Sequence, residues 1–345
     1  MKVAVVNTAV PFLRGGAEIL ADGLARALFL AGHEVAEVKV PLRWSSAAAV
    51  AESMVSASLI TLADADVVIP LKFPAYLIEH HHKTIWLLHQ FRQVYDFWGT
   101  EHQGFPDDDE TAALRDAIRT ADAGSIGGAH AVFTNSAVTA GRLERFNGLS
   151  AEVLLPPVID AAQFRDDGQG DYVLAAGRIN ATKRQELLLE SLAATRTPVR
   201  LIIAGKPESD EELRRMELFV AEHHLEQRVE IIPRFISDTE KRDLMAGALA
   251  VAYLPVDEDS YGYVTAEGML SGKPVVTTTD SGGVHELVEH GVTGLVAEPT
   301  GTELGEALDA LWTDRSTARL LGGQAREKVI ALDLSWDNVL RKLLS

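Results

Sequence analysis

Short, continuously apolar segments alternate with amphipathic segments of helical length along the whole chain. The apolar segments, rich in Val, Ile and Ala, are residues 3–7, 67–70, 85–88, 131–134, 173–176, 200–204, 229–232, 249–254 and 274–278. The amphipathic segments include residues 17–31, 111–121, 185–194, 210–223 and 302–312. Strands that are apolar on both faces and separated by helices are typical of parallel sheets covered on both sides. The pattern therefore predicts a doubly wound α/β architecture.

A hinge is predicted near the middle of the chain. A strand at residues 153–155 runs into Pro156 and Pro157, and a polar stretch with two glycines at residues 166–171 precedes the next strand, which begins at Tyr172. Proline fixes the backbone and interrupts regular structure, so this region is a natural boundary.

The length of the chain, 345 residues, corresponds to about two domains of ordinary size. We expect a first domain over residues 1–160 and a second over residues 161–330. The last segment, residues 335–345, carries its apolar side chains on one side and is expected to pack as a helix across a neighbour. Those side chains are Trp336, Val339, Leu340, Leu343 and Leu344.

Charge and composition narrow the functional classes. The formal net charge of −18 repels nucleic acid and anionic lipid, so neither is an expected partner. There is no cysteine, which excludes disulfides and thiolate metal sites and favours a cytoplasmic location. The first residues read as a strand rather than a signal run, and no apolar run is long enough to span a bilayer. Any site for an anionic ligand must therefore use locally placed cations.

Such cations follow the strand at residues 172–176. Gly177 and Arg178 come first, and Lys183 and Arg184 then open a predicted helix. Thr182 with Gln185 three residues later matches a capping box. In parallel sheets ligands bind at the carboxyl ends of strands, and an anion would relieve the repulsion between cations and a helix N-terminus. The loop therefore predicts a phosphate site; a solvated helix end is the alternative.

Acidic residues surround a second helix start, in the segment DEDSYGYVTAEGMLSGKPVV at residues 257–276. Glu258 and Asp259 precede a Gly and Tyr turn, and Glu267 lies on the helix that follows. Carboxylates accept hydrogen bonds from hydroxyl groups, and a helix N-terminus favours a phosphate. A sugar nucleotide combines both groups, so we interpret this segment as half of a donor-sugar site. For Glu267, an acid that merely complements the helix dipole is an equally good interpretation.

Other strand ends give weaker signals. Gly15 and Gly16 follow the first strand, where backbone N–H groups can approach an anion, although their spacing is not that of a dinucleotide fingerprint. His89 follows the strand at 85–88 and can reach a site at that edge. Phe235, after the strand at 229–232, can wall a base pocket or belong to an ordinary turn.

Two further clusters lie in the predicted first domain. The side chains of His80, His81 and His82 are consecutive and point in different directions, so we do not expect a metal site there. A polar and aromatic stretch can contact an acceptor or simply pack in the core. Its members are Arg92, Tyr95, Trp98 and His102.

Several of these segments together resemble the retaining glycosyltransferases of family 4, which have the two-domain GT-B fold. The matching segments are VAVVNTAVPFLRGGAE, AVFTNSAVTAGRLERF, AEVLLPPVID, VLAAGRINATKR and SGKPVVTTTDSGGVHELVEHGVTGLV. The resemblance covers almost the whole chain, and the last two segments are its more specific part. It implies two Rossmann-like domains facing each other across a cleft, with the C-terminal helix, residues 331–345, crossing back to the first domain.

The resemblance also implies residue roles. Arg178 and Lys183 would hold the donor diphosphate, and Glu267 would bind the ribose hydroxyls. Asp259, eight residues before Glu267, would contact the donor sugar. Backbone N–H groups around four residues would line the sugar and phosphate: Tyr261, Gly262, Tyr263 and Val264. From the first domain, Gly15 and Gly16 would approach the diphosphate, His89 would lie over the transferred sugar, and Arg92 and Tyr95 are the candidate acceptor contacts.

This sequence departs from the family pattern at one position. The family usually has Glu at both acidic places, whereas here the spacing falls on Asp259, and Glu258 is one residue too far from Glu267. Either Asp259 contacts the sugar with a shorter side chain, or the turn bulges so that Glu258 does.

The reaction implied is transfer of a sugar from a nucleoside-diphosphate sugar to a hydroxyl acceptor with retention of configuration. Fixed cations and helix N–H groups suffice to stabilise the leaving diphosphate, so no metal or other cofactor is required. Three alternatives remain: another GT-B enzyme such as a nucleotide-sugar epimerase or a phosphorylase, a glycosidase using two opposed carboxylates, and a non-catalytic protein that binds sugar nucleotides. The base, the sugar, the acceptor and the oligomeric state are left open.

Overall fold

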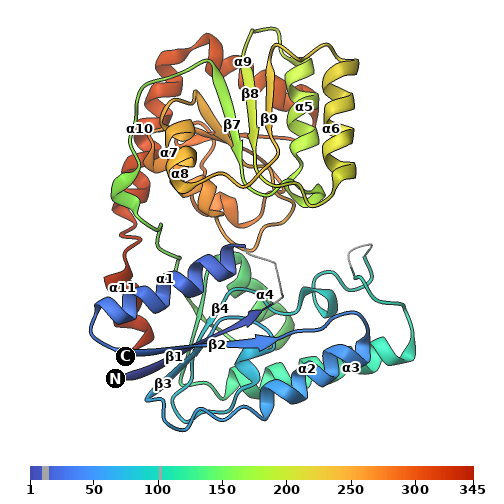
Figure 1. The fold of residues 1–345 in the computed structure, drawn as a ribbon, viewed down its shortest axis with the longest axis vertical. Helices are drawn as coiled ribbons and strands as arrows, with labels where there is room; N and C mark the ends of the chain where they lie inside the picture. The colour runs from blue at the N-terminus through green and yellow to red at the C-terminus, as the bar shows by residue number, and fades with distance from the viewer. Residues whose placement is uncertain (10–14, 101–102) are drawn as a thin grey trace. The chain divides into compact units, whose positions relative to one another are not determined.

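The structure, a computed structural model, describes residues 1–9, 15–100 and 103–345. The chain divides into two compact units, one made of Met1–Pro157 with Ser335–Ser345 and the other of Val158–Leu334 (Figure 1). The division falls directly after the double proline, three residues before the expected boundary at residue 160. Both units are built from parallel strands alternating with helices.

The N-terminal unit contains two short parallel sheets. The first has the order β2-β1-β3, formed by Glu34–Pro41, Lys2–Ala9 and Val67–Pro70, and the second has the order β4-β5-β6, formed by Thr84–Leu87, Ala131–Thr134 and Glu152–Val153. A bridge between Val68 and Lys83, and a hydrogen bond from the Leu88 N–H to the Leu71 carbonyl, join β3 to β4. The two sheets therefore continue into each other.

Helices pack on both faces of these strands. They are α1 (Gly16–Leu30), α2 (Ala47–Ser58), α3 (Asp109–Gly127), α4 (Ala137–Asn147) and, from the end of the chain, α11 (Trp336–Leu343). Val339, Leu340 and Leu343 of α11 are buried in the same apolar cluster as residues of β1 and α1. The amphipathic C-terminal segment thus packs as a helix on the N-terminal unit, as its pattern predicts.

The C-terminal unit contains one six-stranded parallel sheet with the order β12-β11-β10-β7-β8-β9. Its strands are β7 (Tyr172–Ala176), β8 (Arg200–Ala204), β9 (Val229–Ile232), β10 (Ala250–Ala252), β11 (Val275–Thr278) and β12 (Gly294–Ala297). Its helices are α5 (Gln185–Ala194), α6 (Asp210–Glu222), α7 (Asp238–Ala246), α8 (Tyr263–Leu270), α9 (Gly301–Thr313) and α10 (Arg315–Ala331). Short 3₁₀ helices, including η4 (Ala181–Lys183) and η5 (Gly283–Glu286), lie in the connections.

The winding of this sheet locates the place where a ligand can bind. From β7 the chain moves outward through β8 and β9, and then returns to place β10 on the other side of β7 before continuing to β11 and β12. The strand order therefore reverses between β7 and β10. In open parallel sheets the crevice outside the carboxyl ends of the strands at such a reversal is the usual ligand site.

Among the residues described, no helix combines the length and the apolar character that crossing a bilayer requires.

Candidate functional site

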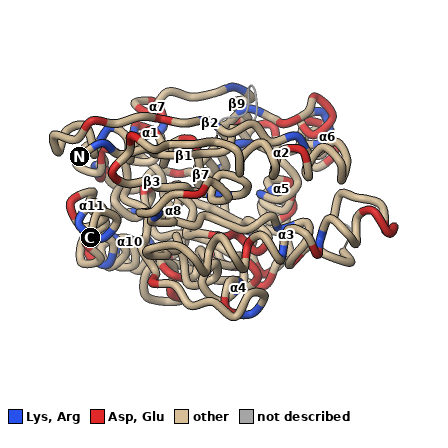
Figure 2. The backbone as a smooth tube through the Cα atoms, turned by 90° about the horizontal axis from the view of Figure 1, so that it is seen from below, with Lys and Arg blue, Asp and Glu red and all other residues tan. Residues whose placement is uncertain are grey.

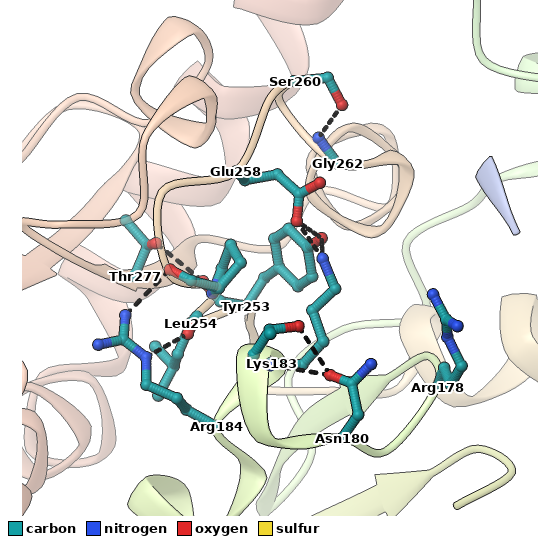
Figure 3. A network of polar contacts seen from close by, with 12 residues as sticks. Arg178, Asn180, Lys183, Arg184, Tyr253, Leu254, Glu258, Ser260, Gly262 and Thr277 are labelled. Atoms are coloured by element: carbon teal, nitrogen blue, oxygen red, sulfur yellow. Dashed lines mark hydrogen bonds and ion pairs between the residues drawn. The ribbon is translucent and has the colours of Figure 1, made fainter. Parts of the chain in front are cut away.

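The candidate site consists of the two loops that follow β7 and β10, the strands on either side of the reversal. The loop after β7 contains Arg178 and Lys183, and the loop after β10 leads through Glu258 and Asp259 into α8 (Figure 3). Segments about 75 residues apart in sequence thus meet at one edge of one sheet, since Lys183 pairs with Glu258. The sheet topology therefore joins the two sequence motifs that predicted a donor site.

The start of the β7 loop is fixed by close backbone packing. Gly177 has a φ of 131°, and a Cβ on Gly205 would lie 1.7 Å from the Gly177 carbonyl oxygen, so both positions require glycine. The side-chain amide of Gln185 donates to the Arg178 carbonyl at 3.1 Å. The Arg178 side chain itself is exposed, and within the described part of the chain it forms no ion pair or hydrogen bond (Figure 3). Its charge is available to a ligand.

The Lys183 ammonium is engaged within the site. It donates to the Tyr253 hydroxyl at 2.7 Å, lies 5.0 Å from the centroid of that ring, and pairs with the Glu258 carboxylate. The Tyr253 hydroxyl donates in turn to the same carboxylate at 2.8 Å. Burial and the Glu258 carboxylate raise the pKa of Tyr253 well above its ordinary value, so its hydroxyl remains a donor at neutral pH.

Arg184 plays a structural part and does not join the expected cluster of phosphate-binding cations. Its guanidinium donates to the carbonyls of Leu254 and Pro255, at 2.7 Å and 2.9 Å, and forms a bidentate pair with Asp280 at 2.7 Å and 2.8 Å. The Arg184 side chain therefore ties the loops after β10 and β11 to the start of α5.

The capping box predicted from Thr182 and Gln185 is wrong. Asn180 caps the 3₁₀ turn η4, accepting a hydrogen bond from the Lys183 N–H, and α5 begins only at Gln185, with Arg184 in a left-handed conformation before it. The Gln185 carboxamide oxygen accepts from the Asn180 N–H instead. Lys183 is therefore the last residue of a 3₁₀ turn, and Arg184 directly precedes α5.

The N-terminus of α8 lies over Tyr253. Gly262 has a φ of 69°, and a Cβ at this position would lie 2.3 Å from Cε1 of the Tyr253 ring. No side chain of the described chain caps this helix; the nearest polar group, the Ser260 hydroxyl, accepts from the Gly262 N–H at 3.4 Å. The first turn of α8 thus lacks a side-chain cap in the described chain, and an uncapped helix N-terminus can bind an anion.

The neighbours of Gly262 are mostly buried. Tyr261 and Val264 are buried, and Tyr263 is half-buried. The Tyr263 hydroxyl and the Thr265 hydroxyl are each shielded from solvent without a hydrogen-bond partner in the described chain. Burial raises the pKa of Tyr263, so it too stays protonated.

Glu267 lies on the second turn of α8 and is 7% exposed. Its carboxylate accepts from the Lys241 ammonium of α7 at 2.5 Å. Burial raises the pKa of Glu267 above its ordinary value, while the Lys241 ammonium acts in the opposite direction. The Glu267 carboxylate is thus bound by a cation from α7, and the interpretation as an acid that only complements the helix dipole does not describe its environment.

The two other acids differ in their surroundings. Glu258 is engaged with Lys183 and Tyr253, whereas Asp259 is half-buried one residue nearer to Glu267. Phe235, after β9, is 77% exposed and stands free of the core.

In the N-terminal unit, a side chain of α1 binds the backbone of the glycine turn that precedes this helix. The Gly15 N–H donates to the Glu18 carboxylate at 2.8 Å, and Glu18 also pairs with Lys72 at 3.1 Å. Burial, the largest single effect, would raise the pKa of Glu18, but the Lys72 ammonium and the hydrogen bonds to the carboxylate, including that from the Gly15 N–H, together shift this pKa downward. The Gly15 N–H is therefore already satisfied, whereas Gly16, the first residue of α1, is exposed.

His89 follows β4 as predicted and is half-buried, with Nδ1 2.7 Å from the carbonyl oxygen of Gln90. The run of three histidines does not converge: both ring nitrogens of His80 contact backbone carbonyls, and the His82 ring packs against His130. Within residues 1–9, 15–100 and 103–345, no group of three or more His, Asp or Glu side chains could hold a metal ion.

The candidate acceptor residues have partners inside the unit. Arg92 forms an ion pair with Asp96 and lies over the Phe97 ring at 4.0 Å. Tyr95 is 4% exposed, and its hydroxyl donates to Asp122 at 2.8 Å and accepts from Asn147 at 3.2 Å. This is the environment of a core residue. His102 lies outside the described residues.

Asp122 is a residue that the sequence did not point to. It is fully buried on α3 and accepts hydrogen bonds from the hydroxyls of Tyr76, at 3.0 Å, and Tyr95. Burial raises the pKa of Asp122 to about 7, although the two tyrosine hydroxyls act in the opposite direction.

In the site itself, sequence reasoning missed Tyr253 and Lys241. Tyr253 lies within the apolar run at residues 249–254, which predicts only a strand, and its hydroxyl was the available signal. Lys241 lies on a polar helix among other charges, where nothing in the sequence distinguishes it.

Acidic residues are spread along the backbone of both units, in keeping with the net charge of −18 (Figure 2). Arg178 and Lys183 lie near a helix N-terminus that no side chain of the described chain caps, and together with acids that can accept from hydroxyls they make a site suited to a phosphorylated, hydroxyl-rich ligand.

Residues 159–328, which make up nearly all of the C-terminal unit, match the family described as "Glycosyl transferases group 1". Among curated proteins, the chain is similar to the alpha-1,3/1,6-mannosyltransferase ALG2 of Mus musculus. The two are 30% identical over 192 residues, which cover 51% of this chain and 45% of ALG2. It is also similar to the GDP-mannose-dependent alpha-(1-6)-phosphatidylinositol monomannoside mannosyltransferase of Mycobacterium tuberculosis, with 28% identity covering 55% of this chain and 54% of that protein. The chain thus spans about half the length of the curated relatives that it matches.

Among solved structures, the chain resembles Anabaena HepE in complex with UDP and glucose. The TM-score is 0.74 at 18% identity, and the match covers 99% of this chain and 98% of HepE. This likeness confirms the predicted fold class, GT-B with two Rossmann-like units.

Proposed function

We propose that the protein is a retaining, metal-independent glycosyltransferase of family 4, which transfers a sugar from a nucleoside-diphosphate sugar to a hydroxyl group of an acceptor. One observation carries the proposal: the loop with Arg178 and Lys183 meets the open N-terminus of α8 where the strand order reverses. In a chain of net charge −18, this edge gathers positive groups suited to a diphosphate.

The diphosphate is bound by three kinds of group. Arg178 is exposed and has no partner in the described chain, and Lys183 lies across the loop from it. The N–H groups at Gly262 and the start of α8 supply the third. Negative charge develops on the diphosphate as it leaves, and fixed positive groups stabilise that charge without rearrangement.

The sugar and the nucleoside of the donor are bound by further residues of the C-terminal unit. Glu267 accepts from the ribose hydroxyls, Asp259 accepts from the sugar, and Phe235 packs on the base. Tyr261, Tyr263 and Val264 shape the floor around α8. Of the two glycines in the N-terminal unit, Gly16 is exposed, whereas the Gly15 N–H is bonded to Glu18.

The chemical step replaces one carbon–oxygen bond with another and transfers one proton. The bond between the anomeric carbon and the diphosphate oxygen breaks, and the acceptor oxygen forms the new glycosidic bond on the same face. The acceptor proton passes to an oxygen of the departing phosphate, and the bonding electron pair leaves with the diphosphate. No side chain of the protein acts as a nucleophile in this scheme.

The names of similar proteins support a nucleoside-diphosphate donor. One relative is GDP-mannose-dependent, and the structural neighbour was crystallised with UDP and glucose. The glycosidase alternative requires one protonated and one free carboxyl group on opposite sides of a bond. Here Glu258 is paired with Lys183 and Glu267 with Lys241, so this pair of acids is already engaged by cations.

A two-stage experiment tests the proposal. The first stage measures the melting temperature of the protein with UDP, GDP, ADP and dTDP, since a ligand at about 100 times its Kd stabilises by about 2.7 kcal/mol. The second incubates the protein with sugars carried by the stabilising nucleotide, with and without EDTA and with hydroxyl acceptors, and measures nucleotide release and the anomeric configuration of the product.

We expect one base to raise the melting temperature, acceptor-dependent nucleotide release that EDTA leaves unchanged, and a product with retained configuration. Conversion of the donor sugar without acceptor would indicate an epimerase, and phosphate-dependent release of sugar phosphate a phosphorylase. Nucleotide binding with no turnover would indicate a non-catalytic protein. No stabilisation by any nucleotide would contradict the proposal.

A further inference from the structure

The main chain at Glu258 is held on both sides. The N–H of Asp257 donates to the Asp280 carbonyl at 2.9 Å, and the N–H of Gly283 donates to the Glu258 carbonyl at 2.9 Å. A Cβ on Gly282 would lie 2.6 Å from the Glu258 nitrogen, so the approach of this second loop depends on glycine. Glu258 is therefore part of a fixed turn, and its carboxylate position is set by the fold.

The side chain of Glu258 forms an ion pair with the Lys183 ammonium. One carboxylate oxygen, Oε2, accepts from both the Lys183 ammonium and the Tyr253 hydroxyl, and these two donors are themselves 2.7 Å apart (Figure 3). The side chains of Lys183 and Glu258 are 21% and 22% exposed. Because both side chains are largely shielded from water, the electrostatic attraction between the two charges is stronger than it would be in bulk water.

A diphosphate approaching this loop meets a site that is only partly positive. Arg178 offers its charge, whereas the charge of Lys183 is cancelled by Glu258, and the carboxylate repels a second anion at the same place. The ammonium can bind phosphate only when its pair with the carboxylate is broken.

We propose that Glu258 is an internal counter-ion of Lys183 that the donor diphosphate must displace, so that this carboxylate lowers the affinity of the site for nucleoside diphosphates. The inference rests on the proposed function. Tyr253 is a positioning residue in the exchange: its ring lies against Gly262, and its hydroxyl continues to accept from the Lys183 ammonium after the phosphate has displaced the carboxylate.

The test compares four proteins, the wild type and three variants, by isothermal titration with UDP, GDP, ADP and dTDP, which carry the diphosphate but no sugar for transfer. The variant is Glu258→Gln, which keeps the size and removes the charge. The matched control is Glu230→Gln, the same chemical change at an exposed residue at the start of β9, 4.0 Å from Arg200 and away from the carboxyl edge of the sheet. Glu258→Ala serves as a second variant should the amide alter the turn.

We expect Glu258→Gln to bind the preferred nucleotide about tenfold more tightly than the wild type, equivalent to about 1.4 kcal/mol, and Glu230→Gln to match the wild type. Binding that appears only in Glu258→Gln or Glu258→Ala supports the inference as well. If the wild type binds the nucleotide and both Glu258 variants bind it with equal or weaker affinity, the inference is overturned and the proposed function is left intact. No binding by any of the proteins overturns both.

Discussion

Gly262→Ala is the substitution for which the structure gives the sharpest expectation. The new Cβ would lie 2.3 Å from Cε1 and 2.9 Å from Cζ of the Tyr253 ring. The ring cannot swing aside freely, because its hydroxyl is bonded to both Lys183 and Glu258. The backbone at Gly262, with φ 69° and ψ 124°, is also one that alanine rarely adopts.

Both effects contribute to the size of the loss. A positive φ costs a residue with a Cβ about 1–2 kcal/mol, and forcing an extra methyl group into a packed site costs about 1–3 kcal/mol. We therefore expect Gly262→Ala to destabilise the protein by about 2–5 kcal/mol. Displacing the ring also moves the Lys183 ammonium, so nucleoside diphosphate affinity should fall as well.

Gly291→Ala is the matched control in the same unit. Gly291 has a φ of 73°, but a Cβ there would meet nothing within 4 Å, so this variant carries the backbone strain without the collision. The assay is urea unfolding of wild type and both variants, together with titration of the preferred nucleotide. Equal stability of the two variants, with unchanged nucleotide affinity, would refute the argument that Gly262 is required by its contact with Tyr253.

Three more predictions follow from the described contacts. Lys183→Ala should lower turnover by on the order of 10²–10³, and turnover within a few-fold of wild type would remove Lys183 from the mechanism. Glu267→Ala should weaken nucleoside diphosphate binding by about 1.5–3 kcal/mol. The carboxylate is structural if Glu267→Ala leaves this affinity unchanged and lowers the melting temperature as much as Lys241→Met does. Since folding raises the pKa of Asp122 to about 7 from 3.8, its contribution to stability is complete below the lower value and is lost as pH rises through the upper one. Urea unfolding between about pH 4 and pH 8 should show wild type losing about 4 kcal/mol relative to Asp122→Asn, and parallel pH profiles would contradict this assignment.

The sequence predicts most of the fold because strands buried on both faces leave a clear pattern. The nine apolar segments coincide with β1, β3, β4, β5, β7, β8, β9, β10 and β11 to within about two residues. The pattern missed β2, Glu34–Pro41, because this edge strand alternates charged and apolar residues and is largely exposed. It also missed β12, which is short and opens with glycine.

The sequence sufficed to predict which types of residue form the site, but not which of them contact one another. The positions of Arg178 and Lys183 after a strand sufficed to suggest an anion site, but Arg184, their neighbour in sequence, turns back to Asp280. Such a difference depends on the left-handed backbone at Arg184, which no local pattern signals. In the same way, the pairing of Glu267 with Lys241 joins two helices, and only the folded chain brings them together.

Titration of the wild-type protein with nucleoside diphosphates and with the parent nucleosides tests the central claim most directly, since the two ligands differ only in the phosphates. If Arg178, Lys183 and the start of α8 form a diphosphate site, one diphosphate binds at least about tenfold more tightly than its nucleoside, and the difference shrinks in Arg178→Ala. Equal affinity for diphosphate and nucleoside, or saturable binding of neither, would contradict the account.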